Sequence, residues 1–537
     1  MALHIWWLEG QYFKTQTLKP VPKNLLMPLM KLAQILEKIK TPHEVITSPK
    51  VIAEVEIDDI ATDSRLVKKN SIFFALRGEK NDGAEFVFQS VNQGAQAIVI
   101  SKHSKFDFDI FFQQYPQITV IISDDNFLLL VEFLQIFYQP FPKNIYAVTG
   151  TNGKTSTVEF IRQILKFLNI KSASIGTLGI NCDDIKKQDL INFNLTTPDI
   201  VALYKNLHIL KNSAIDDVAI EVSSIGLDQG RIAGLEIGIA GFTNFTQDHL
   251  DYHLTMEKYF YAKLQLFTKY LQPMAYAVLN ADVKEYHEIV QNCQKRQIKI
   301  IDYGFAAQKL KLIKIDQQKI FFEFNDKQYQ FEMSASGDFQ AFNLLCALGC
   351  VLSKHNLNED DLMQLMKKFL ELKSAAGRMQ QIAQLKNNAQ IFIDFAHSPD
   401  ALENVLKQAK SMLDNKKLSK EISPKLVVLF GCGGDRDKQK RPIMGKIASE
   451  LADIVIVSDD NPRSENPQLI RKEILSGCLQ KNIIEINDRR LAIIEAIKIL
   501  NDNDILILAG KGHEKYQIIG DKKIDFDEEQ IVKNAIK

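Results

Sequence analysis

The chain has 537 residues, of which 46% are hydrophobic and 25% charged, and its formal net charge is zero. This length exceeds what one hydrophobic core usually supports, so about two to four domains of a globular protein are expected. The balanced charge gives no support to a nucleic-acid binder, which usually carries a basic excess. No apolar run is long enough for membrane insertion, and six scattered cysteines without a CxxC pair suit a reducing compartment, so a cytoplasmic location is expected.

The N-terminal part divides into an extension and a first domain. Residues 1–26 lack the charged segment and cleavage site of a signal peptide and contain Pro20 and Pro22, so we expect an extension outside the folded body. Residues 27–141 begin with an amphipathic helix whose apolar positions run from Leu29 to Ile39. The strands and the helix expected after it lie at 71–76, 97–100, 118–122 and 126–138.

The second domain, residues 142–371, opens with a motif typical of phosphate binding. An apolar strand at 145–149 precedes a glycine turn and a helix, and the N–H groups of such a turn bind phosphate oxygens. The turn consists of Gly150, Thr151, Asn152, Gly153, Lys154, Thr155 and Ser156. Lys154 is expected to reach the outer phosphates of ATP and Thr155 to ligate Mg²⁺. Val148 replaces the first glycine of the strict Walker pattern, so an ordinary turn is the alternative.

Metal-ligand residue types follow later strands of this domain. Glu221 ends a strand expected at 217–222, and His249 follows one expected at 237–242. Carboxylate and imidazole groups after neighbouring strands hold hard cations beside ATP phosphates. Taken alone, His249 equally suits a helix cap, and Lys263 suits a solvated position on a helix.

The third domain, residues 372–537, alternates strands with helical patterns, which predicts a parallel, doubly wound sheet. Its strands are expected at 391–395, 425–430, 454–458 and 505–509. Polar clusters follow the last three strands. Because ligands of open α/β sheets bind at the carboxyl ends of strands, we expect these clusters to share one site.

These motifs, in this order and spacing, resemble the Mur ligase family from about Ile60 to nearly the C-terminus. The matching segments are TDSR (62–65), GTNGKTS (150–156), TTP (196–198), EVSS (221–224), DHLDYH (248–253), GRM (377–379), AHSPDALE (396–403), GCGGDRDKQKRP (431–442), DNPR (460–463) and GKGHE (510–514). The resemblance implies three α/β domains. These are an N-terminal UDP-binding domain, a central P-loop-type ATPase with a parallel sheet, and a C-terminal Rossmann-like domain that binds an amino acid.

The implied activity is that of an acid–amino-acid ligase in peptidoglycan synthesis. ATP would phosphorylate the D-glutamate carboxylate of UDP-N-acetylmuramoyl-L-alanyl-D-glutamate, and the amine of meso-2,6-diaminopimelate would attack the acyl phosphate. The implied cofactors are ATP, Mg²⁺ and a carbamylated lysine at Lys263. A monomer that acts on small-molecule substrates is expected.

The resemblance also implies roles residue by residue. ATP would be bound by the glycine turn, Asn343 and Arg378. The UDP-muramoyl-peptide would be bound by Thr62, Ser64, Glu79, Lys80, Asn81, Thr196, Thr197, Ser223, Gln229 and Arg231. The amino acid would be bound by Arg436, Asp460, Asn461, Pro462, Arg463, Gly510 and Glu514. The catalytic residues would be Lys154, Glu221, His249 and Lys263, and the metal ligands Thr155, Glu221, His249 and Lys263.

The chain departs from the family pattern at four positions, none of them assigned to phosphate or metal binding. Ile225 and Gln340 replace a usual histidine and asparagine, and Phe395 and Ser398 replace a tyrosine and a threonine. Three alternatives stay open: L-lysine as the amino acid, a folylpolyglutamate-type synthetase, and a non-catalytic module that senses UDP-peptides. No residue identifies the general base, since His397 suits that role and a structural one equally.

Overall fold

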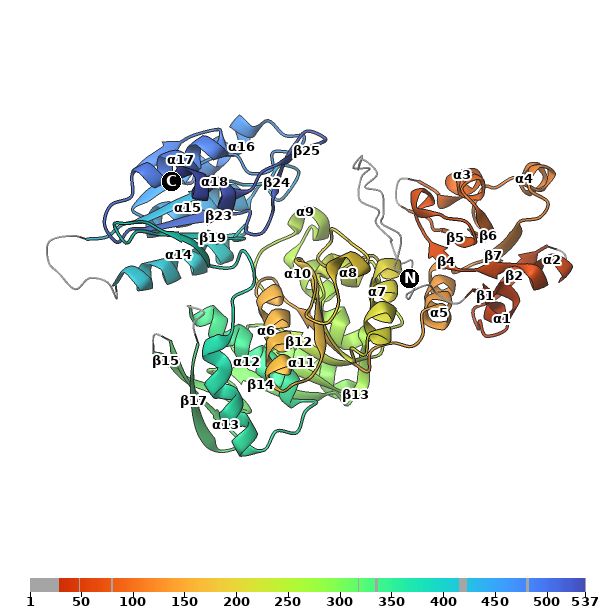
Figure 1. The fold of residues 1–537 in the computed structure, drawn as a ribbon, viewed down its shortest axis with the longest axis horizontal. Coiled ribbons are helices and arrows are strands. Elements are labelled where there is room, and N and C mark those ends of the chain that lie inside the picture. The colour runs from red at the N-terminus through yellow and green to blue at the C-terminus, as the bar shows by residue number, and fades with distance from the viewer. Residues whose placement is uncertain are drawn as a thin grey trace. The chain divides into compact units, whose positions relative to one another are not determined.

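The structure, a computed structural model, describes residues 29–47, 49–78, 81–316, 318–333, 337–414, 423–479 and 482–536 (Figure 1). The extension predicted at 1–26 and the predicted site residues Glu79 and Lys80 lie outside these ranges. Within them, no helix combines the length and apolar character needed to cross a membrane. Two compact units are formed. One contains the described residues up to Ile145 with Lys171–Gly238 and Lys269–Gln272, and the other contains Tyr146–Ile170, Ile239–Thr268 and the described residues from Pro273 onward.

The N-terminal sheet has five strands in the order β2-β7-β6-β5-β4, parallel except for the β2–β7 pair. All five residues of β5, with sequence SIFFA, are buried, as is usual for a parallel strand covered on both faces. The elements are α2 (Pro49–Glu54), β2 (His43–Ile46), β4 (Asp59–Ala61), β5 (Ser71–Ala75), α3 (Val87–Asn92), β6 (Ala95–Ser101), α4 (Phe108–Gln114), β7 (Thr119–Ser123) and α5 (Asn126–Phe137).

The first predicted helix is shorter than expected. Met30–Lys31 forms β1, which pairs with β3 (Glu56–Ile57), and α1 covers only Leu32–Leu36. Leu32 is buried, whereas Leu29 is exposed. The prediction of one helix from Leu29 to Ile39 is therefore wrong, because the same spacing of leucines also fits a short strand followed by one turn of helix.

The middle of the chain contributes a ten-stranded sheet in the order β10-β9-β11-β8-β12-β13-β14-β15-β16-β17. The strands predicted at 145–149, 217–222 and 237–242 are confirmed as β8 (Asn144–Thr149), β11 (Asp217–Glu221) and β12 (Ile237–Phe242). The antiparallel extension β15–β17 was not predicted, because its strands carry many exposed polar residues. The other elements are α7 (Ile200–Asn212), α8 (Ser224–Asp228), α9 (Leu250–His253), α10 (Met256–Gln265), α11 (Tyr286–Lys295), α12 (Asp338–Leu352), α13 (Glu359–Lys367), β9 (Ser172–Gly176), β10 (Gly179–Cys182), β13 (Leu271–Asn280), β14 (Lys299–Gly304), β15 (Leu310–Asp316), β16 (Lys319–Phe324) and β17 (Lys327–Glu332).

Helix α6 (Lys154–Phe167) follows β8 and carries the phosphate loop at its N-terminus. Near its other end, the side chain of Gln163 binds the chain segment that leads into the C-terminal domain. The Lys373 N–H donates to Gln163 Oε1 at 2.9 Å, and Gln163 Nε2 donates to the Lys373 carbonyl at 3.0 Å. The start of the C-terminal domain is therefore tied to the helix that carries the phosphate loop.

The C-terminal sheet has the order β18-β19-β23-β20-β21-β22 and is parallel except for the β18–β19 pair, which confirms the predicted doubly wound sheet. Side chains of β20 alternate between two cores. Val428 packs in the core that includes residues of α14–α16, and Leu429 packs in the core that includes residues of α17 and α18. The elements are β18 (Gln380–Gln384), β19 (Gln390–Asp394), α14 (Pro399–Asp414), β20 (Leu426–Phe430), α15 (Lys440–Leu451), β21 (Ile454–Val457), α16 (Pro467–Leu475), β22 (Ile483–Glu485), α17 (Arg489–Lys498), β23 (Ile505–Ala509), β24 (Tyr516–Ile519), β25 (Lys522–Asp525) and α18 (Glu528–Ala535).

Candidate functional site

The phosphate loop joins β8 to α6, as its strand–turn–helix pattern predicts. The first part of the loop is held by Asn244, which follows β12. The Thr151 N–H donates to the Asn244 carbonyl at 2.9 Å, and the Asn152 N–H donates to the Asn244 side-chain oxygen at 2.8 Å. Gly153 has a φ of 85°, and a Cβ there would lie 2.2 Å from Asn343 Oδ1. Only glycine therefore fits at this position. The predicted adenine-site residue Asn343 packs directly against the loop.

Two lysines converge on this loop. Lys154 Nζ and Lys263 Nζ each donate a hydrogen bond of 2.8 Å to the carbonyl oxygen of Gly150. Lys263 is buried, with its ammonium 4.4 Å from the ring centre of Tyr259. Desolvation, together with the charge of Lys154, lowers the pKa of Lys263 well below its usual range. The alternative of a solvated helix lysine is therefore wrong.

Asp248 is a buried carboxylate that the predicted site residues did not include, although it belongs to the DHLDYH motif. Its Oδ2 lies 3.6 Å from His249 Nε2 and 3.5 Å from His397 Nε2, and its Oδ1 lies 3.8 Å from Lys440 Nζ. Burial opposes its ionisation, but His249, His397 and Lys440 hold the pKa of Asp248 well below its usual range. Desolvation lowers the pKa of His249 to about 4. His249 is therefore a neutral imidazole near pH 7, which is the form that ligates metals.

Two contacts of the phosphate loop involve residues of the third domain. Arg378 Nη2 donates to Thr155 Oγ1 at 3.3 Å, which brings two predicted ATP-site residues together. Asn152 Nδ2 donates to Asp400 Oδ2 at 2.8 Å. Ser156 is buried in the first turn of the helix. The loop is thus joined by hydrogen bonds to Arg378 and Asp400.

In the other compact unit, residues predicted to bind the muramoyl-peptide form one hydrogen-bonded group. The hydroxyl of Thr197 donates to the Glu221 carbonyl at 3.0 Å and accepts from the Ser223 N–H at 2.9 Å. Arg231 donates to the Thr197 carbonyl at 2.8 Å and to Gln229 Oε1 at 3.0 Å. Gln229 Nε2 is buried without a hydrogen-bond partner among the described residues, so this group retains a donor for a ligand.

Thr177 orients Glu221, and sequence reasoning missed it. The Thr177 N–H donates to Glu221 Oε1 at 2.8 Å, and its hydroxyl lies 3.1 Å from Glu221 Oε2 and 3.2 Å from the hydroxyl of Thr196. Thr177 lies in none of the matching segments. The available signal was its position directly after the strand β9.

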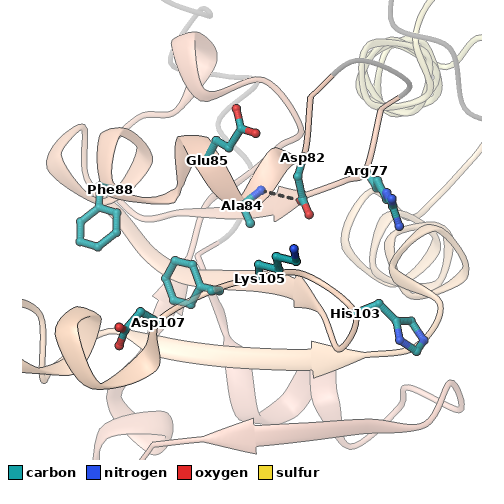
Figure 2. Close-up of a pocket in the computed structure, with 9 residues that line it drawn as sticks. Arg77, Asp82, Ala84, Glu85, Phe88, His103, Lys105 and Asp107 are labelled. Atoms are coloured by element: carbon teal, nitrogen blue, oxygen red, sulfur yellow. Dashed lines mark hydrogen bonds between the residues drawn. The ribbon is translucent and has the colours of Figure 1, made fainter.

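The residues predicted to bind the uridine nucleotide follow β4 and β5. Thr62 follows β4 directly, and the buried Ser64 donates to Gln89 Oε1 at 3.1 Å. A cavity of about 460 Å³ in the same domain is lined by residues that include Arg77, Asp82 and Phe88, and the predicted residues Thr62, Ser64 and Asn81 are not among its lining residues. Figure 2 shows Arg77 at one end of this cavity and Phe88 at the other.

The three polar clusters of the third domain meet, because β23, β20 and β21 are neighbours in its sheet. Asn461 Nδ2 donates to Glu514 Oε2 at 3.0 Å, and the fully buried Lys511 donates to Asn461 Oδ1 at 3.0 Å. A Cβ at Gly510 would lie 2.7 Å from Asp460 Oδ2. The structure therefore brings together the strand ends that the sequence predicts to share a site.

Arg463 lies at this meeting point with unused donors. Its Nη1 donates to the Gly434 carbonyl at 2.7 Å, and within the described part of the chain its Nε and Nη2 groups donate no hydrogen bond. Burial, with the charge of Arg436, lowers the pKa of Arg463. Although burial opposes it, Lys511 and other cations lower the pKa of Asp460. The cluster thus offers both an anion-binding group and carboxylates.

Comparisons with known proteins agree with these observations. Three family models match the chain: Mur ligase family, catalytic domain (56–129), Mur ligase middle domain (148–351) and Mur ligase, glutamate ligase domain (377–512). The chain is 41% identical over 494 residues to the UDP-N-acetylmuramoyl-L-alanyl-D-glutamate--2,6-diaminopimelate ligase of Rickettsia montanensis, with 90% of this chain and 96% of that protein covered.

Two solved structures illustrate the shared fold. The structure of a UDP-N-acetylmuramoyl-L-alanyl-D-glutamate--2,6-diaminopimelate ligase matches with a TM-score of 0.58 and 28% identity, and the match covers 95% of this chain and 99% of that one. The MurF ligase from Thermotoga maritima in complex with ADP matches with a TM-score of 0.57 and 14% identity, covering 89% and 96%. The motifs, the fold and these matches together place the chain in the Mur ligase family, to which it belongs.

Proposed function

We propose that this chain is an ATP-dependent ligase that adds meso-2,6-diaminopimelate to UDP-N-acetylmuramoyl-L-alanyl-D-glutamate in peptidoglycan synthesis. The observation that carries the proposal is the half-buried guanidinium of Arg463, which has two unused donors beside Asp460 and Glu514. Diaminopimelate carries a carboxylate and an ammonium at its distal end, whereas L-lysine carries only the ammonium. A planar guanidinium pairs bidentately with a carboxylate, and the two acidic side chains would receive the ammonium.

The family matches support a division of the chain by substrate. Residues 27–141 would bind the uridine nucleotide, 142–371 ATP and the muramoyl-peptide, and 372–537 the amino acid. The cavity lined by Arg77, Phe88 and Lys105 supports the first assignment, since it offers an aromatic ring and cationic side chains for a base and its phosphates. The unused Nε2 donor of Gln229 supports the second.

The reaction needs ATP because a free carboxylate would have to expel oxide. The D-glutamate side-chain oxygen would attack the γ-phosphorus, ADP would leave, and an acyl phosphate would form. Lys154 and the N–H groups of the loop would neutralise charge on the transferred group. The amine would then attack the acyl carbon, lose a proton, and displace inorganic phosphate through a tetrahedral intermediate.

Magnesium is the cation that the predicted ligand types suit, with substrate completing its shell. Among the described residues, no group of three or more acidic, histidine or cysteine side chains could hold a metal by itself. Mg²⁺ typically takes only one or two carboxylates from the protein and completes its shell with water and phosphate oxygens. Thr155, Glu221 and His249 would be its protein ligands. When bound, the ion would supply further charge neutralisation at the phosphates.

We assign a carbamate to Lys263. Its amine would attack the carbon of CO₂, form an N–C bond and release a proton to water. Burial supports this assignment, because it favours the neutral, nucleophilic amine. The product would place an anionic carbamate beside Gly150 and supply oxygen ligands, which hard cations prefer.

The test is a ligation assay with the purified chain, ATP, Mg²⁺ and the UDP-linked dipeptide, offered diaminopimelate or L-lysine. We expect the wild type to ligate diaminopimelate and Arg463→Ala to lose that preference. Lysine would leave the Arg463 guanidinium without a carboxylate partner, and where bound substrate excludes water an unpaired charge costs about 2–5 kcal/mol, which is enough for strong discrimination. Arg490→Ala, an exposed arginine of the same domain, is the matched control and should behave as wild type. A wild-type preference for lysine, or an unchanged preference in Arg463→Ala, would overturn the proposal.

A further inference from the structure

Two loops build the surroundings of Arg463. The glycine loop, residues 431–437, follows β20, and the arginine loop, residues 460–465, follows β21. The Gly434 N–H donates to the Asn461 carbonyl at 2.9 Å, and Arg463 Nη1 donates to the Gly434 carbonyl at 2.7 Å. The position of the Arg463 guanidinium therefore depends on how the two loops are aligned.

The alignment is not imposed by the arginine loop alone. Arg463 has a φ of 52°, which lies in the left-handed region. A residue with a Cβ rarely adopts this backbone conformation unless its surroundings stabilise it. Its N–H donates to the Ile518 carbonyl at 3.1 Å, and its carbonyl accepts from the Gly520 N–H at 2.8 Å. These contacts fix the main chain of Arg463 against residues 518–520. A second set of contacts is needed to fix the arginine loop against Gly434 of the glycine loop.

Glu465 provides that second set. Its Oε1 accepts a hydrogen bond of 2.6 Å from the N–H of Asp435 in the glycine loop. The Asp435 carboxylate accepts from the N–H and the hydroxyl of Ser464 at 3.1 and 2.7 Å. Each loop thus binds the other through one carboxylate, directly beside Arg463 in the chain.

A fully buried arginine holds Glu465 in turn. Arg441, on α15, donates from Nη1 and Nη2 to the two Glu465 oxygens at 3.1 and 2.9 Å, and from Nη2 to the Gly433 carbonyl at 3.1 Å. Its Nη1 also donates to Glu473 on α16 at 2.7 Å. Arg441 therefore connects both loops to the helical layer of the domain, without belonging to the predicted amino-acid site.

The two loops are also packed closely against each other at Gly434. A Cβ at Gly434 would lie 1.9 Å from the Pro462 carbonyl oxygen and 3.2 Å from the Cβ of Glu465. Only glycine permits this close approach. A small displacement of Glu465 would therefore be transmitted directly to Gly434, the residue that accepts the hydrogen bond of Arg463.

We propose that Glu465, held by Arg441, is a positioning residue that aligns the two loops, sets where Arg463 presents its guanidinium, and so determines which amino acid is ligated. This inference rests on the proposed function, because it concerns the same amino-acid site. Glu465 acts through Arg463 and needs no contact with the substrate.

A matched pair of substitutions isolates this role. Glu465→Gln and Glu473→Gln each remove one carboxylate from the same buried Arg441, but only Glu465 touches the glycine loop. In Glu465→Gln we expect the KM for diaminopimelate to rise roughly ten- to a hundredfold and the preference over lysine to fall, because small misplacements of a binding group have effects of this size. The KM values for ATP and for the UDP-linked dipeptide should stay within about twofold, since those sites are untouched. Glu473→Gln should behave as wild type in all three KM values.

A second measurement is independent of the substrate. Amide hydrogen exchange of the free protein should quicken in residues 431–437 and 460–465 of Glu465→Gln and stay unchanged there in Glu473→Gln. If Glu465→Gln does not fold, Glu465→Asp, which keeps the charge but shortens the side chain, should show the same pattern. Equal rises in all three KM values, equal effects of the two glutamine variants, or unchanged exchange in both loops would overturn the inference. Failure of the wild type to ligate diaminopimelate would instead overturn the proposed function, while the exchange result would still report on the alignment.

Discussion

Lys263 Nζ lies 2.8 Å from the carbonyl oxygen of Gly150, although 113 residues separate the two in the chain. Gly150 is the first residue of the phosphate loop, and Lys154 binds the same oxygen. The fold therefore holds together the loop that would bind the phosphates and the lysine that would carry the carbamate.

Removing the loop lysine should stop the reaction and leave the fold intact. In Lys154→Ala we expect phosphate release to fall on the order of a thousandfold, because the charge on the transferred phosphoryl group loses its main cationic partner. The melting temperature should change little. Lys166→Ala, an exposed lysine near the other end of the same helix, should keep wild-type turnover. Wild-type turnover in Lys154→Ala with saturating substrates would contradict this assignment.

Lys263→Ala should be nearly inactive and partly rescued by short carboxylic acids, which would supply the missing oxygen ligands. Isotopically labelled bicarbonate should give a carbamate signal by nuclear magnetic resonance in the wild type and none in the variant. Lys258→Ala, an exposed lysine on the same helix, serves as the control. Full activity of Lys263→Ala, or an identical signal in both proteins, would reject the carbamate.

Gly153→Ala tests the packing of the phosphate loop. The added methyl group would meet Asn343 Oδ1 at 2.2 Å, and the positive φ would cost about 1–2 kcal/mol for a residue with a Cβ. We therefore expect a higher KM for ATP with an unchanged KM for the amino acid. An ATP titration that matches the wild type would show that the loop tolerates a side chain there.

Acid should weaken the fold through Glu465. Hydrogen bonds from Arg441 lower the pKa of Glu465 to about 2, from an ordinary value of 4.5. A carboxylate with a depressed folded-state pKa stabilises the fold fully above its unfolded-state pKa, and this contribution is lost as the pH falls through the folded-state pKa. The contribution is on the order of 3 kcal/mol. The difference in urea midpoint between wild type and Glu465→Gln should be constant near neutral pH and should shrink between the two pKa values. A difference that grows in acid would contradict the sign.

Features encoded by neighbouring residues could be predicted from the sequence. The strand, the glycines and the helix that make the phosphate loop lie within about 25 residues, and each strand-end cluster directly follows its strand. The order of the strands then brings the clusters of Asn461 and Glu514 together. The prediction of a long helix from Leu29 was wrong, because a short run of spaced apolar residues fits a strand as well as a helix.

Contacts between distant residues could not be predicted in this way. Neither the burial of Lys263 nor the pairing of Arg441 with Glu465 has a local pattern, because each depends on how separate helices and loops pack. Asp248 and Arg441 lie inside motifs that the resemblance supplied, but only the fold shows which side chains face them. Thr177 had no motif at all, and the hydrogen bonds to Glu221 reveal its role.

The two hydrogen bonds between Gln163 and Lys373 tether the start of the third domain to helix α6. The tether is mounted on the same helix whose first turn would bind ATP, at a distance of roughly 14 Å along the helix axis. The helix that would bind ATP therefore also holds the start of the domain that would bind the amino acid. A short tether of this kind raises the effective concentration of the bound amine at the acyl phosphate, because the domain loses its own translational freedom once, during folding, and only the amino acid loses freedom in each turnover.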